Sequence, residues 1–117
     1  MEKYDSDTHT ERVKSLCELI LYENNHKYND IGCEVELEYY NNLGHRRVIR
    51  EIDFFGIYNN NDIDLYEYKC NDTSKGYQKA KIQLREQKKY LEPFFNVKHM
   101  FYVSGKNFKI KEIKPRL

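Results

Sequence analysis

Two runs of strand-forming residues, 47–58 and 63–70, are separated by only four residues, 59–62, which read Asn-Asn-Asn-Asp. Aliphatic and aromatic side chains dominate both runs, whereas Asn and Asp favour tight turns. Strands joined by so short a turn pair antiparallel with each other. The sequence therefore predicts a β-hairpin in the middle of the chain, and this hairpin restricts how the other elements can be arranged.

Two amphipathic helices flank the predicted hairpin region. Apolar residues recur at helical spacing from Thr8 to about Glu23, which predicts the first helix. The second helix is predicted from near Gly76 to Leu91. It ends before Pro93, whose ring disfavours the helical conformation in the residue that precedes it.

Further strands are predicted on both sides of the second helix. Residues 34–40 alternate apolar and acidic side chains, which is typical of a half-buried strand whose acidic face is solvated. Residues 97–105 are predicted to form a strand after the second helix, and 108–115 are compatible with another short edge strand. The order helix, three strands, helix, strand predicts an α/β fold in which a mixed sheet has a helix against each face.

Length and composition predict a single domain over residues 1–117. The 20 basic and 19 acidic residues nearly cancel, so any affinity for nucleic acid must come from local clusters. Three widely spaced cysteines, Cys17, Cys33 and Cys70, lead us to expect neither disulfides nor a zinc site, and a reducing compartment. Without a long apolar run or an apolar signal-peptide centre, we expect a soluble, cytoplasmic protein that does not enter membranes.

Three charged residues, Asp53, Glu67 and Lys69, interrupt the apolar alternation of the hairpin strands. A register that pairs Tyr58 with Asp62 sets the two carboxylates opposite each other on one face, with the lysine two residues further along. Carboxylates so close repel each other unless a cation joins them, and Mg²⁺ commonly binds one or two protein carboxylates. The alternative interpretation is a salt-bridge cluster on a wet face, worth about 0.2 to 1 kcal/mol per pair.

The sequence "EID", thirteen intervening residues and then "EYK" resembles the active-site hairpin of the PD-(D/E)xK nucleases, which include many restriction enzymes and archaeal Holliday junction resolvases. The predicted order of elements is similar to that superfamily as well, although no Pro precedes the Asp. The resemblance implies a restriction-endonuclease-like core, α-β-β-β-α-β, with no organic cofactor. It implies that Asp53, Glu67 and the carbonyl of Tyr68 bind Mg²⁺, which Mn²⁺ could replace, and that Lys69 is the catalytic lysine.

The resemblance also suggests candidates on the two helices. Many members contribute a Glu from the first helix, and Glu11 is the candidate here, although it also fits a capping box with Thr8. His9 lies on the apolar side of that helix and is interpreted as a partly buried structural histidine. RecB-like members place a Gln, and a Tyr four residues after it, on the second helix near the site or the DNA. Gln83 is the candidate for the Gln, and Gln87 stands where the family has the Tyr, so only Gln83 is carried over.

Nucleic-acid contacts are predicted on the second helix because its basic cluster supplies positive charge that the net charge does not. These candidates are Lys75, Lys79, Lys81, Gln83 and Arg85. An ordinary solvated lysine face is the alternative interpretation.

The predicted function is a metal-dependent endonuclease that cleaves DNA and selects branched structures as a Holliday junction resolvase does. A homodimer is expected, because a junction has two-fold symmetry. Two alternatives stay open: a non-catalytic nucleic-acid-binding or assembly subunit with the same fold, and an endonuclease that acts on RNA.

Overall fold

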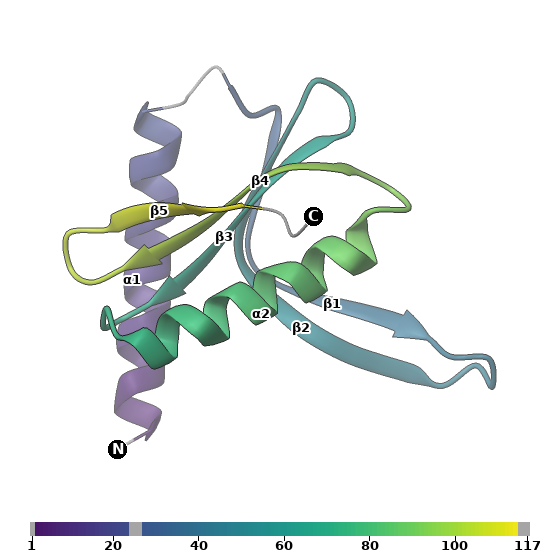
Figure 1. Cartoon of the computed structure of the whole chain (residues 1–117), viewed down its shortest axis with the longest axis horizontal. Helices are drawn as coiled ribbons and strands as arrows, with labels where there is room; N and C mark the ends of the chain where they lie inside the picture. Colours follow the sequence, from purple (N-terminus) through teal and green to yellow (C-terminus); the bar gives the residue numbers. More distant parts are fainter. Residues whose placement is uncertain (1, 24–26, 115–117) are drawn as a thin grey trace.

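The computed structural model of the chain describes residues 2–23 and 27–114. Its elements, in chain order, are α1 (Glu2–Glu23), β1 (Asp30–Tyr40), β2 (Arg46–Tyr58), β3 (Asp62–Lys69), α2 (Ser74–Leu91), β4 (Asn96–Ser104) and β5 (Lys109–Ile113) (Figure 1). The five strands form one sheet in the order β1-β2-β3-β4-β5. Only the pair β3 and β4 is parallel, and α2 makes the crossover that a parallel pair requires. The predicted α/β class and mixed sheet are confirmed.

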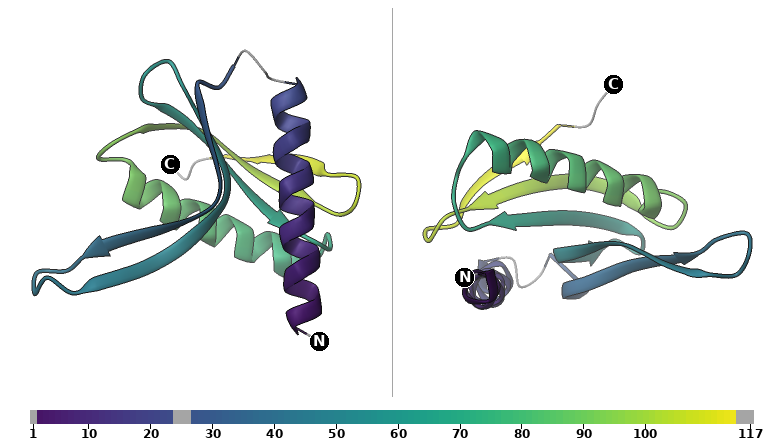
Figure 2. Two further views of the ribbon diagram at one scale, coloured as in Figure 1. Left: turned by 180° about the vertical axis from the view of Figure 1, so that it is seen from behind. Right: turned by 90° about the horizontal axis from the view of Figure 1, so that it is seen from below.

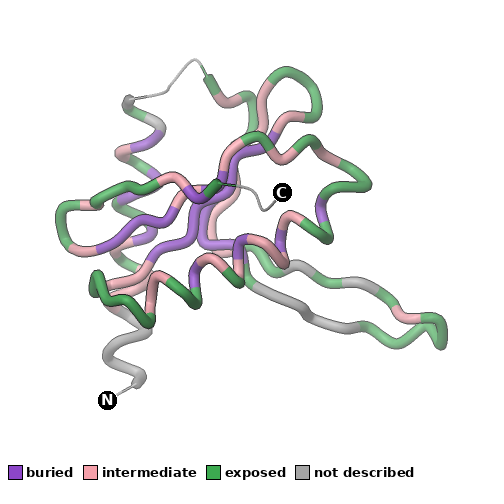
Figure 3. The backbone as a smooth tube through the Cα atoms, in the orientation of Figure 1, coloured by how far each residue is buried: buried purple, intermediate pink, exposed green. Residues whose placement is uncertain are grey.

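The two helices cover opposite faces of the sheet, as predicted (Figure 2). The core on the α1 side consists of Val13, Leu16, Cys17, Ile20, Phe54, Tyr66, Tyr68 and Val103. The core on the α2 side consists of Ile52, Ile63, Leu65, Ala80, Leu84, Leu91, Met100, Tyr102 and Ile113. Buried positions therefore concentrate along the central strands, above all β3 (Figure 3). None of the described helices is both long and apolar enough to cross a lipid bilayer.

The start of α1 differs from the prediction. The helix begins at Glu2 rather than at Thr8, so Thr8 lies inside it and cannot act as its N-cap. The proposed capping box of Thr8 and Glu11 is therefore wrong. The second helix does have a side-chain cap, because the hydroxyl of Thr73 accepts a hydrogen bond of 2.9 Å from the amide of Gly76.

The cysteines differ from the prediction as well. Cys17 on α1 and Cys33 on β1 form a disulfide, and Cys70 is free. The spacing argument failed because packing of α1 against the sheet brings together two residues that are 16 positions apart in sequence. The disulfide removes the basis for inferring a reducing compartment.

The predicted hairpin register is confirmed from Tyr58 and Asp62 as far as Phe54 and Tyr66. The ladder between the two strands ends there and does not continue to Asp53. The part of β2 that precedes Phe54 in the chain curves away from β3. It pairs with β1 to form a two-stranded arm beside α2 (Figure 1). The position where the two strands separate is the position where the predicted acidic residues lie.

Candidate active site

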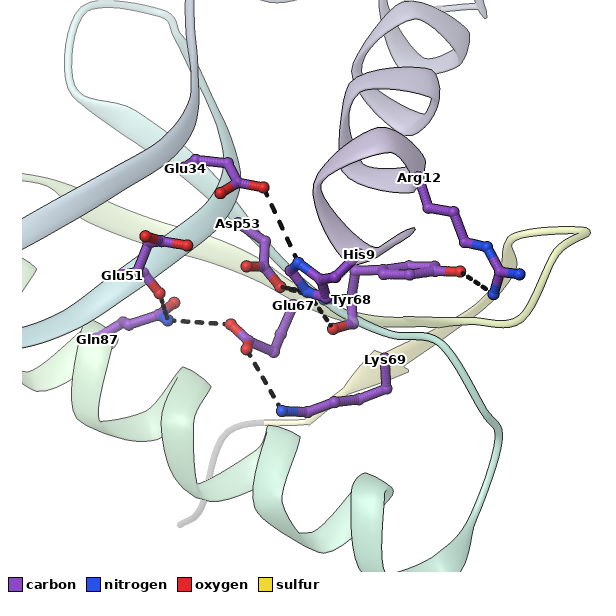
Figure 4. Close-up of polar contacts among 9 residues, drawn as sticks. All are labelled: His9, Arg12, Glu34, Glu51, Asp53, Glu67, Tyr68, Lys69 and Gln87. Atoms are coloured by element: carbon purple, nitrogen blue, oxygen red, sulfur yellow. Dashed lines mark hydrogen bonds and ion pairs between the residues drawn. The ribbon is translucent and has the colours of Figure 1, made fainter. Parts of the chain in front are cut away.

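Asp53 and Glu67 lie where β2 separates from β3, between α1 and α2 (Figure 4). Both carboxylates are buried, with 3 % and 4 % of their surface exposed. A carboxylate removed from water raises the free energy of the folded state unless a cation or hydrogen-bond donors compensate it. This burial contradicts the interpretation of the pair as part of a salt-bridge cluster on a wet face.

The carboxylate of Asp53 is fixed by groups from β3 and α1. Its Oδ2 accepts a hydrogen bond of 2.7 Å from the amide of Tyr68, which replaces the next step of the β2–β3 ladder. The Nε2 atom of His9 lies 3.5 Å from the same oxygen and 3.2 Å from the carbonyl oxygen of Tyr68. The hydrogen bond to Asp53 raises the pKa of His9 above its usual value. His9 is partly buried, as predicted, and in addition it connects α1 with the acidic pair.

Glu67 lies between a lysine and a buried amide. Gln87 donates a hydrogen bond of 3.2 Å from Nε2 to Glu67 Oε1, and the Nζ atom of Lys69 lies 3.8 Å from Oε2 (Figure 4). Burial, followed by the charge of Asp53, raises the pKa of Glu67 to about 8. Gln87 is fully buried and contacts Glu67, which the family spacing did not predict.

Two more carboxylates, Glu34 and Glu51, belong to the same cluster. Glu34 Oε1 lies 3.9 Å from His9 Nδ1. Burial, followed by the charge of Glu34, raises the pKa of Glu51. Glu34 has a φ of 53°, a left-handed conformation that costs free energy for a residue other than glycine. The expectation that the acidic face of β1 is simply solvated is wrong at Glu34.

The charge and hydrogen-bond balance of this cluster fits a divalent cation. Glu34 and Asp53 lie near His9, and Glu67 lies near Lys69, while Glu51 interacts electrostatically with Glu34 and Asp53. Glu34 Oε1 and Gln87 Oε1 are buried without a hydrogen-bond partner, and such oxygens are suitable ligands for a hard cation. Among the described residues, no three His, Cys, Asp or Glu side chains form a ready-made ligand set. Mg²⁺ does not require one, since it retains several waters beside one or two carboxylates.

Glu11, the acidic residue predicted for the site on the first helix, is exposed on α1. It follows His9 by two residues, which separates the two side chains by about 200° around a helix. Glu11 therefore points away from the face of α1 that carries His9 to Asp53.

The predicted nucleic-acid contacts on α2 separate into three groups. Lys75 and Lys79 line a cavity of about 350 Å³ together with Lys69, whose ammonium lies 3.8 Å from Glu67. Lys81 lies apart, with its Nζ atom 5.0 Å from the centre of the Tyr77 ring.

Gln83 and Arg85 form the third group and are partly buried along α2. Gln83 Oε1 and Arg85 Nε are buried without a hydrogen-bond partner. Neither side chain contributes to the polar contacts described above for Asp53 and Glu67.

No family model and no curated protein sequence matches this chain. The chemistry that the site supports follows from its own side chains. Two buried carboxylates and a backbone carbonyl could serve as oxygen ligands for a hard divalent cation. Lys69, at the border of the adjoining cavity, provides a positive charge that can stabilise a negatively charged group bound there.

Proposed function

We propose that this protein is a metal-dependent endonuclease that hydrolyses DNA phosphodiester bonds, with a restriction-endonuclease-like core. The observation that carries the proposal is the buried pair Asp53 and Glu67, with the Tyr68 backbone beside the first and Lys69 beside the second. A buried acidic pair lowers the stability of a small sheet. Binding of a cation and a phosphate gives a reason for keeping these charges.

Within this proposal, Asp53, Glu67 and the carbonyl of Tyr68 hold Mg²⁺ or Mn²⁺. The bound ion makes water more acidic and offsets negative charge on a phosphate. His9 contacts Asp53 and the Tyr68 carbonyl, so it orients two of the ligands and is the residue through which α1 acts on the ion. Gln87 holds Glu67 from the opposite face of the sheet.

Lys69 connects the acidic pair with the cavity in which the substrate backbone would lie. Its ammonium reaches Glu67, and its side chain lines the cavity together with Lys75 and Lys79. We assign to Lys69 the stabilisation of charge that develops on the phosphate during hydrolysis. Lys75 and Lys79 contact the phosphates of the bound strand.

Branched DNA such as a Holliday junction is the substrate we propose, with the protein acting as a homodimer. A junction has two-fold symmetry, and two copies of the chain would present two cleavage sites to it. One observation favours a different function: Glu11, the acidic candidate on α1, is exposed and points away from the acidic pair. A non-catalytic nucleic-acid-binding subunit is therefore the second candidate, and an RNA endonuclease would use the same site.

The test is cleavage of branched and linear DNA duplexes, and of an RNA duplex, by the purified protein in Mg²⁺ and in EDTA. We expect Mg²⁺-dependent nicking, fastest on branched DNA, and no product from Asp53→Asn, which loses a metal ligand. Absence of cleavage by the wild type together with equal DNA binding in Mg²⁺ and EDTA would favour the non-catalytic subunit.

Lys69→Ala distinguishes a catalytic role of Lys69 from a role limited to balancing the charge of Glu67. We expect cleavage to fall by about 10² to 10³ fold, as when a preorganised donor to a transition state is removed. The fold and metal binding should largely survive, because Asp53 and Glu67 remain as ligands. Lys14→Ala on the exposed side of α1 removes the same charge elsewhere and should cut at the wild-type rate.

A further inference from the structure

A second cavity, of about 340 Å³, is lined by residues from the start of α2 and from β4 and β5. Its lining includes Asp72, Tyr77, Tyr102, Ser104, Lys109 and Lys111. None of these residues has a role in the proposed cleavage site. Thr73 lines both this cavity and the one that contains Lys69, so the two cavities adjoin at the N-terminus of α2.

Two lysines bring positive charge to one side of this cavity. The Nζ atom of Lys111 lies 4.5 Å from the centre of the Tyr77 ring, and that of Lys81 lies 5.0 Å from the same ring. Within the described part of the chain, neither ammonium is within 4.0 Å of a carboxylate. Cation–π contacts hold these ammonium groups in place without neutralising their charge.

Asp72 is the acidic residue in the lining, and its carboxylate already has partners. Its Oδ1 accepts a hydrogen bond of 3.1 Å from the Tyr102 hydroxyl, and its Oδ2 lies 3.9 Å from Lys109 Nζ. Lys109 therefore offsets the charge of Asp72. The charges of Lys111 and Lys81 remain in excess, so the cavity favours an anion.

The geometry also indicates which kind of anion fits. Two ammonium groups lie over the Tyr77 ring, so a nucleobase has no free access to stack on those positions. The lysine ammonium groups are hydrogen-bond donors that suit phosphate oxygens, whereas the Tyr102 hydroxyl already donates to Asp72. A nucleic-acid strand that passes along the cavity of Lys69 meets this second cavity across Thr73.

We propose that the cavity between α2 and β5 is a second phosphate-binding subsite, which holds a backbone phosphate of the bound DNA outside the cleavage site. This inference rests on the proposed function, because it takes DNA as the substrate. Lys111 makes the principal contact with the phosphate, and Asp72 weakens binding by repulsion. The subsite extends the contact surface along the strand and sets its position relative to Asp53 and Glu67.

The experiment measures binding of a fluorescein-labelled DNA duplex by anisotropy, in EDTA to prevent cleavage and over a series of NaCl concentrations. Log affinity falls linearly with log salt concentration, and loss of one phosphate contact makes this negative slope shallower by about 0.9. Between 1 M and 0.1 M salt, the variant therefore gains roughly eightfold less affinity than the wild type. We expect this result for Lys111→Ala. Lys98→Ala, near the opposite end of β4, removes the same charge and should keep the wild-type slope.

Asp72→Asn gives a result of opposite sign, which misfolding would not produce. The amide oxygen can still accept the Tyr102 hydrogen bond, so we expect tighter DNA binding than in the wild type. The subsite would be overturned if Lys111→Ala and Asp72→Asn both keep the wild-type slope and affinity. It would also be overturned if Lys98→Ala and Lys111→Ala lose DNA affinity equally. A wild-type protein that still binds and cuts DNA would then leave the endonuclease proposal intact. A wild-type protein that neither binds nor cuts DNA would overturn both.

Discussion

Glu67 interacts with both the basic and the acidic side chains of the site. Its carboxylate is buried, receives a hydrogen bond from Gln87, lies near Lys69 and is repelled by Asp53. With a pKa of about 8, Glu67 retains a proton at neutral pH when no metal ion is bound. If a divalent cation binds here, as proposed, it would displace that proton, and metal affinity should then increase with pH. A carboxylate in this setting links metal binding to the protonation of the whole acidic cluster.

The contribution of α1 can be tested by comparing two residues on the same helix. His9 contacts Asp53 and the Tyr68 carbonyl, whereas Glu11 is exposed and points elsewhere. Loss of a side chain that orients metal ligands typically costs 10- to 100-fold in affinity or activity. We therefore expect His9→Ala to weaken Mn²⁺ binding in calorimetry, and to slow cleavage, by about that factor. Glu11→Ala should stay within about twofold of the wild type, and the reverse pattern would assign the α1 role to Glu11.

The central acidic residues could be predicted from sequence because they interrupt an otherwise apolar hairpin whose register is set by a short turn. Gln87 could also have been found. It follows Ala80 and Leu84 at helical spacing and precedes Leu91, so it lies on the buried face of α2. Gln83 lies beside that face and is partly buried. The helical phase of the buried residues, rather than the family spacing, therefore identifies Gln87.

At the scale of elements, hydrogen-bond competition shapes the site. The amide of Tyr68 donates to the side chain of Asp53 instead of to the β2 backbone, so the ladder ends one step before the acidic pair. On the other side of β2, no ladder pair forms between Glu34 and Asp53, and Glu34 adopts a positive φ. Period-two alternation describes regular strands only. The sequence therefore predicted the hairpin and its register, but not the irregular step that turns Glu34 towards His9.

The disulfide between α1 and β1 holds together the elements that carry His9 and Glu34. Closing a loop of about 15 residues stabilises a fold by roughly 3 kcal/mol in the chain-entropy model. We expect a reductant to lower the free energy of unfolding in urea by that amount. Cys70→Ser should show the same effect of reductant, because Cys70 is free. The double variant Cys17→Ser/Cys33→Ser should show none, and a wild-type protein insensitive to reductant would contradict the role of the disulfide.

At the scale of the whole molecule, a nearly neutral chain separates its charges in space. The net charge is +1, yet acidic side chains gather between the two helices while lysines border the two cavities at the start of α2. The composition indicated that any nucleic-acid affinity must come from local clusters. It did not indicate that Lys109 and Lys111 join Lys75 and Lys79 at the same end of α2. That proximity depends on the pairing of β5 with β4, which brings distant parts of the sequence together.

The acidic cluster should make the stability of the whole protein depend on pH and on divalent cations. In EDTA, folded Glu67 has a pKa of about 8 against an ordinary value of 4.5, so between these values the folded state holds a proton that the unfolded chain releases. Stability therefore falls as the pH rises from about 5 to 8, by at most about 1.4 kcal/mol per pH unit. His9, whose pKa is also raised, loses its stabilising proton in the same direction. In EDTA, the melting temperature should decrease from pH 5 through 6.5 to 8, and Mg²⁺ should raise it again at pH 8. Glu67→Gln should show a weaker dependence on pH. A melting temperature that rises with pH in EDTA and does not respond to Mg²⁺ would contradict the assignment of this cluster as a cation site.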